Sequence, residues 1–127
     1  MFSHVMLGAD DVGAAKTFYD AILGALGHRP GRQDDKGRVF YPNEGGTLMI
    51  SNPINGEAAC HANGGTVGFR GDSPEAVDAW HAAGVANGGT SCEDPPGYRV
   101  GDFGKLYLAY LRDPAGNKLC GVYRPPA

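Results

Sequence analysis

Two side chains capable of chemistry stand near opposite ends of the sequence, His4 in the first strand-like stretch and Cys120 in the last. Because side chains alternate between the two faces of a strand, the His4 side chain lies on the face opposite Val5 and Leu7. The imidazole could bind a ligand there, or it could be a partly buried histidine with a structural partner. At a cavity wall near His4, the Cys120 thiol could have a lowered pKa and act as a nucleophile. The alternative is a cysteine that simply packs in the interior, which is common for free cysteine.

Arg70 is a third candidate, because it follows a short apolar stretch that predicts a strand. It alternates with Phe69 and therefore shares a face with Thr66 and Gly68. A guanidinium group on that face could bind a carboxylate or a phosphate through two parallel hydrogen bonds. It could equally be a surface arginine at a strand end, paired with Asp72 or with solvent.

Tyrosines supply the remaining candidates. Tyr107 and Tyr110 lie in the Tyr- and Leu-rich stretch Lys105–Arg112, which predicts a strand, and they fall on its opposite faces. Only one of them can line a cavity, and we take Tyr107 as the candidate, although tyrosine is also an ordinary strand residue. The Pro/Gly-containing stretch Asp94–Asp102 is interpreted as a loop, either a lid or a plain connector.

Composition excludes several classes of function. The net charge of −3 offers neither a basic surface for nucleic acid nor a polybasic patch for a membrane. No apolar run approaches the roughly 20 residues of a membrane-spanning helix, and the first residues do not resemble a signal peptide. The three cysteines form no Cys-x-x-Cys pair, so we expect reduced thiols and a cytoplasmic location. No Ser/His/Asp arrangement or phosphate-binding loop is present.

The elements that must position these residues occur twice. A strand at 4–7 leads into a helix at Val12–Ala25, and sixty-two residues later a strand at 66–69 leads into a helix at 74–87. Asp10 or Asp11 in the first copy, and Ser73 in the second, are suitable N-caps. Short extended segments follow each helix, so the order β-α-β-β-β is predicted twice.

This repeat predicts an α+β fold with helices segregated to one face of the strands. Its length fits one domain, 1–127. We expect a first module at about 1–52, a linker at about 53–63 and a second module at about 64–127.

Several segments together resemble the vicinal oxygen chelate superfamily, which includes glyoxalase I, bleomycin-resistance proteins and extradiol dioxygenases. The resemblance covers essentially the whole chain. Its most specific part is the stretch 112–119, Arg-Asp-Pro-Ala-Gly-Asn-Lys-Leu, which is close to the family's DPDGN turn between its last two strands. The other parts are His4, Phe18-Tyr19-Asp20 and the helix around Trp80. The resemblance implies two βαβββ modules that form a cupped half-barrel, with the helices outside and a ligand cavity inside.

Metal-dependent members of that family take four ligands, typically His or Gln, Glu, His and Glu, from the first and last strands of the two modules. Carried onto this chain, these positions are His4, Met49, Thr66 and Cys120. Both glutamates and the second histidine are therefore missing, which disfavours a hard divalent cation. His4 and Cys120 remain the only plausible ligands. A soft set of His, Met and Cys could still hold Cu(I) or Zn²⁺.

Two functions follow from the resemblance. One is an enzyme, of the lyase or dioxygenase kind, that acts on a small oxygenated molecule with a degenerate metal site. The other is a non-catalytic, bleomycin-resistance-like protein that binds and sequesters a small molecule. The resemblance also implies a homodimer. The cavity-lining candidates in either case are His4, Met49, Thr66, Arg70, Tyr107 and Cys120.

Overall fold

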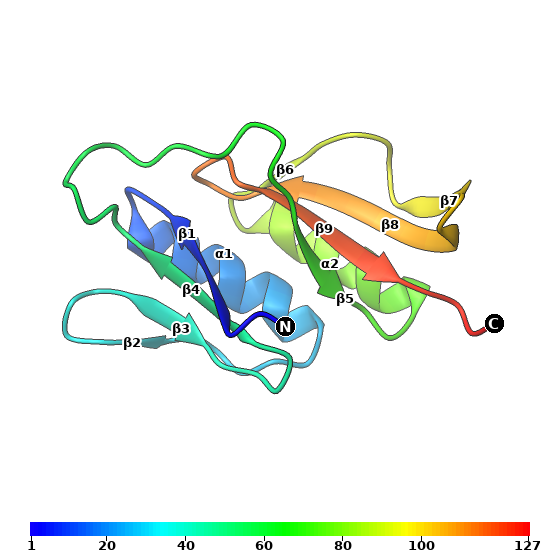
Figure 1. Ribbon diagram of the computed structural model, residues 1–127, viewed down its shortest axis with the longest axis horizontal. Coiled ribbons are helices and arrows are strands. Elements are labelled where there is room, and N and C mark those ends of the chain that lie inside the picture. The colour runs from blue at the N-terminus through cyan, green and yellow to red at the C-terminus, as the bar shows by residue number, and fades with distance from the viewer.

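The computed structural model describes residues 1–127 and consists of two helices and two separate sheets (Figure 1). The first half of the chain forms five elements: β1 (His4–Gly8), α1 (Val12–Ala25), β2 (Arg32–Gln33), β3 (Val39–Tyr41) and β4 (Thr47–Ser51). The second half forms six: β5 (Val67–Arg70), α2 (Pro74–Ala86), β6 (Thr90–Ser91), β7 (Gly97–Gly101), β8 (Gly104–Arg112) and β9 (Lys118–Tyr123). No helix is long and apolar enough to cross a membrane.

Each sheet mixes parallel and antiparallel pairs. The first has the strand order β1-β4-β3-β2, and the second has β5-β9-β8-β6 with β7 also paired to β8. The first and last strands of each half are parallel neighbours, β1 with β4 and β5 with β9. Figure 1 shows α1 and α2 side by side behind the sheets, with the edge strands β1 and β5 toward the middle of the molecule. The predicted α+β class is confirmed, and the two sheets are not closed into a barrel.

Local sequence explains where both helices begin. The Asp11 side chain accepts a hydrogen bond from the Ala14 amide at 2.9 Å, and the Ser73 side chain accepts one from the Ala76 amide at 3.0 Å. Both bonds satisfy amides that the first helical turn leaves without partners. Pro74 occupies the first turn of α2, where its missing N–H costs nothing.

Both helices bury one side in a single hydrophobic core. Phe18 and Trp80, which occupy matching positions in the two helices, are fully buried in it. Gly121 lets β9 pass directly over the indole, because a Cβ at that position would lie 2.7 Å from a Trp80 ring carbon. Core contacts therefore join the two halves through the helix layer.

A buried carboxylate also connects the two halves. Asp113 is 5% exposed and begins the turn between β8 and β9. One carboxylate oxygen, Oδ1, accepts hydrogen bonds from the Ala115 and Asn117 amides, and the other, Oδ2, accepts one from the Tyr19 hydroxyl of α1 at 2.6 Å. The Asn117 amide group donates to Asp113 and to the Gly8 carbonyl of β1. The turn of the second half is thus bonded to both leading elements of the first.

One sequence interpretation is corrected by the structure. The stretch Asp94–Asp102, expected to be a loop and a candidate lid, contains β7, which pairs antiparallel with β8. Gly101 and Gly104 are paired across a two-residue turn, and Gly104 has a φ of 92° that favours glycine. The sheet partner and this tight turn convert a glycine-rich stretch into a strand, so it is not a free lid.

Removing the buried carboxylate should destabilise the whole chain. Asp113→Ala leaves the Tyr19 hydroxyl and two backbone amides without partners, so we expect a loss of about 3 kcal/mol in the free energy of unfolding. Tyr19→Phe removes one bond and should cost about 1 kcal/mol. Urea unfolding monitored by circular dichroism measures both values. Tyr123→Phe is the matched control, because that hydroxyl makes no hydrogen bond within the chain, and a similar loss in the control would contradict this account.

Candidate functional site

Each sheet has one face against the helices and one face directed away from them, which we call the open face. In the first sheet, Leu7, Leu48 and Ile50 point toward the core. Their neighbours alternate to the open face, and the register places Met6 beside Met49 and Met49 beside Phe40. The open face of the first sheet is therefore formed by His4, Met6, Phe40, Thr47 and Met49.

His4 lies on the open face at the start of β1 and is exposed. Its Nδ1 lies 2.7 Å from the Ser3 hydroxyl, whereas its Nε2 makes no hydrogen bond within the chain. Met49 is half-buried on the neighbouring strand, one step along from His4 on the same face. The structure thus brings His4 and Met49 to one surface, with one imidazole nitrogen available to a ligand.

The open face of the second sheet carries its own small apolar cluster. Leu106, Leu108 and Cys120 are buried there, with Tyr110 and Val122 packed against them, and this cluster is separate from the main core. The register places Cys120 between Gly68 of β5 and Tyr110 of β8. The result is an apolar floor with a thiol and a phenol at its centre.

The Cys120 thiol is neutral at physiological pH. Burial raises its pKa, and the nearby groups that also act on this pKa are Tyr110, Glu93, Lys118 and Arg99. His4 is not among them, so the suggestion that His4 lowers the pKa of this thiol is wrong. Burial and then the neighbouring Cys120 raise the pKa of Tyr110 to about 12. Both groups are therefore hydrogen-bond donors rather than anions near neutral pH.

A charged pair borders this thiol and phenol. The Lys118 ammonium group pairs with Glu93 and lies 5.0 Å from the centroid of the Tyr110 ring. Glu93 has a φ of 56°, a left-handed conformation that is uncommon for a residue with a side chain. The pair neutralises itself and supports one side of Tyr110.

Tyr107 does not belong to this surface. Its hydroxyl donates to the Asp78 carboxylate of α2 at 2.6 Å, and its ring packs against the main core. Tyr110, three residues further along β8, is the tyrosine of the open face. Ala109 and Leu111 are fully buried on the Tyr107 side, whereas Leu106 and Leu108 occupy the other face, so the sequence alternation alone does not decide between the two tyrosines.

The other candidates lie on the open face of the second sheet. Thr66 is exposed and directly precedes β5, and Arg70 is exposed at the end of β5, opposite Val122. Thr66 and Cys120 share one face, as His4 and Met49 do in the first sheet. The four positions therefore form two pairs on two sheets that are not hydrogen-bonded to each other.

The donor atoms at these four positions do not fit the divalent cation of the family. They are one imidazole, one thioether, one exposed hydroxyl and one buried neutral thiol, without any carboxylate. Hard cations are bound through oxygen atoms, usually with at least one carboxylate among them, and a thiol must lose its proton before it ligates a metal. The structure contains no cluster of three or more His, Cys, Asp or Glu residues that could hold a metal ion.

Comparison with known proteins gives a consistent result. The family model described as "Glyoxalase/Bleomycin resistance protein/Dioxygenase superfamily" matches residues 1–120. A glyoxalase/bleomycin resistance protein from Albidiferax ferrireducens is 59% identical, with a TM-score of 0.94 over 98% of this chain and 99% of its own. A lactoylglutathione lyase from Agrobacterium tumefaciens is 26% identical, with a TM-score of 0.64 over 95% of this chain and 91% of its own.

A glyoxalase-related enzyme from Fulvimarina pelagi is 20% identical with a TM-score of 0.75, and it covers 97% of this chain and 87% of its own, which shows a shared fold. No protein of curated function matches the chain.

The alkylation rates of the thiols test whether Cys120 is protonated near neutral pH. Iodoacetamide reacts with thiolates, so at pH 7.5 the exposed Cys60 should be alkylated well before Cys120, whose pKa is raised by burial. Reactivity of Cys120 should increase only at a pH well above the range in which an ordinary thiol ionises. Mass spectrometry of timed samples measures the order in which the cysteines are alkylated, and urea-unfolded protein is the control. Alkylation of Cys120 first at neutral pH would contradict the neutral thiol.

Proposed function

Because the chain belongs to the glyoxalase/bleomycin resistance protein/dioxygenase superfamily, we propose that it binds a small oxygenated molecule on its open faces without the divalent metal that metal-dependent members use. The observation that carries this proposal is the donor set at His4, Met49, Thr66 and Cys120, which lacks every carboxylate. A ligand there is held by hydrogen bonds and apolar contact instead of chelation.

The open-face residues suit such binding. Tyr110 and Cys120 are uncharged polar groups set in an apolar floor of Leu106, Leu108 and Val122, and the Cys120 thiol donates to the Gly121 carbonyl at 3.6 Å. Uncharged donors set in an apolar surface are typical of sites that recognise the oxygens of small molecules. His4 supplies a further polar group from the first sheet through its unbonded Nε2.

A catalytic role of the lyase or dioxygenase kind is the second candidate. The similarity to a lactoylglutathione lyase favours it. Chelation chemistry would require ligands that this chain does not have, so a catalytic version must rely on its own acid and base groups. Turnover of a bound ligand in the presence of EDTA distinguishes an enzyme from a protein that only sequesters.

We further propose that two copies pair as a homodimer. Supporting this, the edge strands β1 and β5 have no partner on their outer sides, and β1 exposes 47% of Met6 on the open face. In this proposal a second copy covers the open faces that carry the two pairs of site residues. Sedimentation equilibrium should give twice the 13.3 kDa mass of one chain, and a stable monomer would remove this part of the proposal.

The expected cytoplasmic location is retained as a part of this proposal. Three free cysteines, one of them exposed, support a reducing compartment.

Ligand binding without metal is tested by thermal unfolding. Purified protein in EDTA is screened against small acids, diols, catechols and keto acids, and we expect at least one to raise the melting temperature. Gly68→Leu fills the open face beside Cys120, where a Cβ would meet only Val122 at 3.9 Å, so it should abolish that increase without lowering the melting temperature of the free protein.

Val85→Ala, on the exposed side of α2, is the control that should leave binding unchanged. Ligand binding that disappears in EDTA, or that survives Gly68→Leu, would contradict the proposal.

A further inference from the structure

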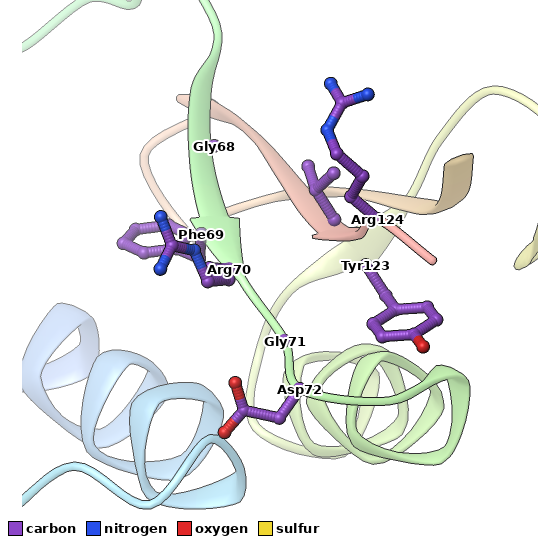
Figure 2. Close-up of a pocket in the computed structure, with 8 residues that line it drawn as sticks. Gly68, Phe69, Arg70, Gly71, Asp72, Tyr123 and Arg124 are labelled. Atoms are coloured by element: carbon purple, nitrogen blue, oxygen red, sulfur yellow. The ribbon is translucent and has the colours of Figure 1, made fainter. Parts of the chain in front are cut away.

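The second sheet has a hollow of about 530 Å³ at the C-terminal ends of β5 and β9, shown in Figure 2. Two arginines line it, Arg70 from β5 and Arg124 from the residue after β9. Val122 is paired with Arg70, and Gly68 precedes Arg70 by two residues; both belong to the same open face as Cys120. The hollow is therefore continuous with the surface proposed above to bind a ligand.

Neither arginine has a carboxylate partner. Arg70 makes no hydrogen bond or ion pair within the chain, and Arg124 donates only to the Phe103 carbonyl, at 3.1 Å. Asp72 also lines the hollow, but Figure 2 shows its carboxylate directed toward α1 and away from Arg124. Figure 2 shows the Arg70 guanidinium group on the α1 side of β5 and the Arg124 guanidinium group directed away from it, so the hollow is bordered by two separate guanidinium groups with unused hydrogen-bond donors.

A third arginine on the same face also lacks a carboxylate partner. Arg99 of β7 faces the same side as Leu106, and its guanidinium group is held by the carbonyls of Asp94, Pro95 and Gly97 without any carboxylate. Glu93, at the border of this face, is already paired with Lys118. The open face of the second sheet therefore carries three arginines, Arg70, Arg99 and Arg124, that have no carboxylate partner, although the chain as a whole has 14 acidic and 11 basic side chains.

The same surface leaves room for an apolar group. Gly68 has no side chain, and open space lies above it apart from Val122 at 3.9 Å from a Cβ position. This gap lies between Arg70 and the row of Cys120 and Tyr110. A ligand that filled it would place an apolar part over Gly68 and Val122 while its charged end reached the arginines.

We propose that this hollow binds a small organic anion, whose carboxylate or phosphate group pairs with Arg70 and Arg124 when these exposed side chains turn toward the hollow, and whose apolar part lies over Gly68. The inference rests on the proposed function and names the chemical class of its ligand. Planar guanidinium groups suit both kinds of anion, because each offers parallel N–H donors to two oxygens.

The test compares charged and neutral compounds of the same shape. Benzoate, phenyl phosphate and the neutral benzamide are titrated separately into ¹⁵N-labelled protein, and the amide signals of Gly68 and Gly71 report binding at the hollow. We expect either or both anions to bind at least about tenfold more tightly than benzamide. The anion that binds more tightly, benzoate or phenyl phosphate, shows whether the hollow prefers a carboxylate or a phosphate group.

Variants then assign the effect to the two arginines. Arg70→Gln and Arg124→Gln should each weaken anion binding about tenfold and leave benzamide unchanged. Arg29→Gln is the matched control, an exposed arginine outside the hollow that makes no hydrogen bond or ion pair within the chain.

Equal binding of benzoate and benzamide, lost in Gly68→Leu, would overturn the anion inference while leaving the proposed ligand surface intact. Absence of any shift at Gly68 and Gly71 with all three compounds would also overturn it.

Discussion

The carboxylate of Asp113 is the contact on which the arrangement of the two halves depends. It is buried, and it is stabilised because the turn it begins supplies two backbone amides and the Asn117 side-chain amide, while α1 supplies the Tyr19 hydroxyl. Burying a charge without such partners would cost several kcal/mol. The same turn bonds Gly8 through Asn117, so β1 is held near the start of β9. The placement of the strands that carry the site residues follows from this network and from the common core.

The open faces held by this arrangement differ from those of metal-dependent family members in the donor atoms at four positions. At the positions where the family resemblance implies two glutamates and a second histidine, this chain has a thioether, a hydroxyl and a thiol whose pKa is raised by burial. Positive charge on the open face comes from Arg99 and Arg124, whose guanidinium groups donate hydrogen bonds only to backbone carbonyl groups. Under the proposal, recognition by hydrogen bonds, apolar contact and guanidinium charge requires no chelated cation.

Much of this could be predicted from sequence, because the signals are local. Helix caps at Asp11 and Ser73, and the turn begun by Asp113, depend on residues a few positions apart. The choice between Tyr107 and Tyr110 could not be made locally, because apolar residues occupy both faces of β8: Leu111 in the main core and Leu108 on the open face. The strand β7 and the raised pKa of Cys120 also depend on partners far apart in the sequence.

Metal content tests the central claim most directly. Untagged protein purified without chelators is analysed for transition metals, together with Cys120→Ala and the unaltered chain after incubation with Zn²⁺, Ni²⁺ and Mn²⁺ followed by gel filtration. The donor set predicts far less than one equivalent of any metal in every sample, with no difference between the variant and the unaltered chain. About one equivalent of a transition metal, retained by the unaltered chain and lost in Cys120→Ala, would contradict the account and identify Cys120 as a ligand.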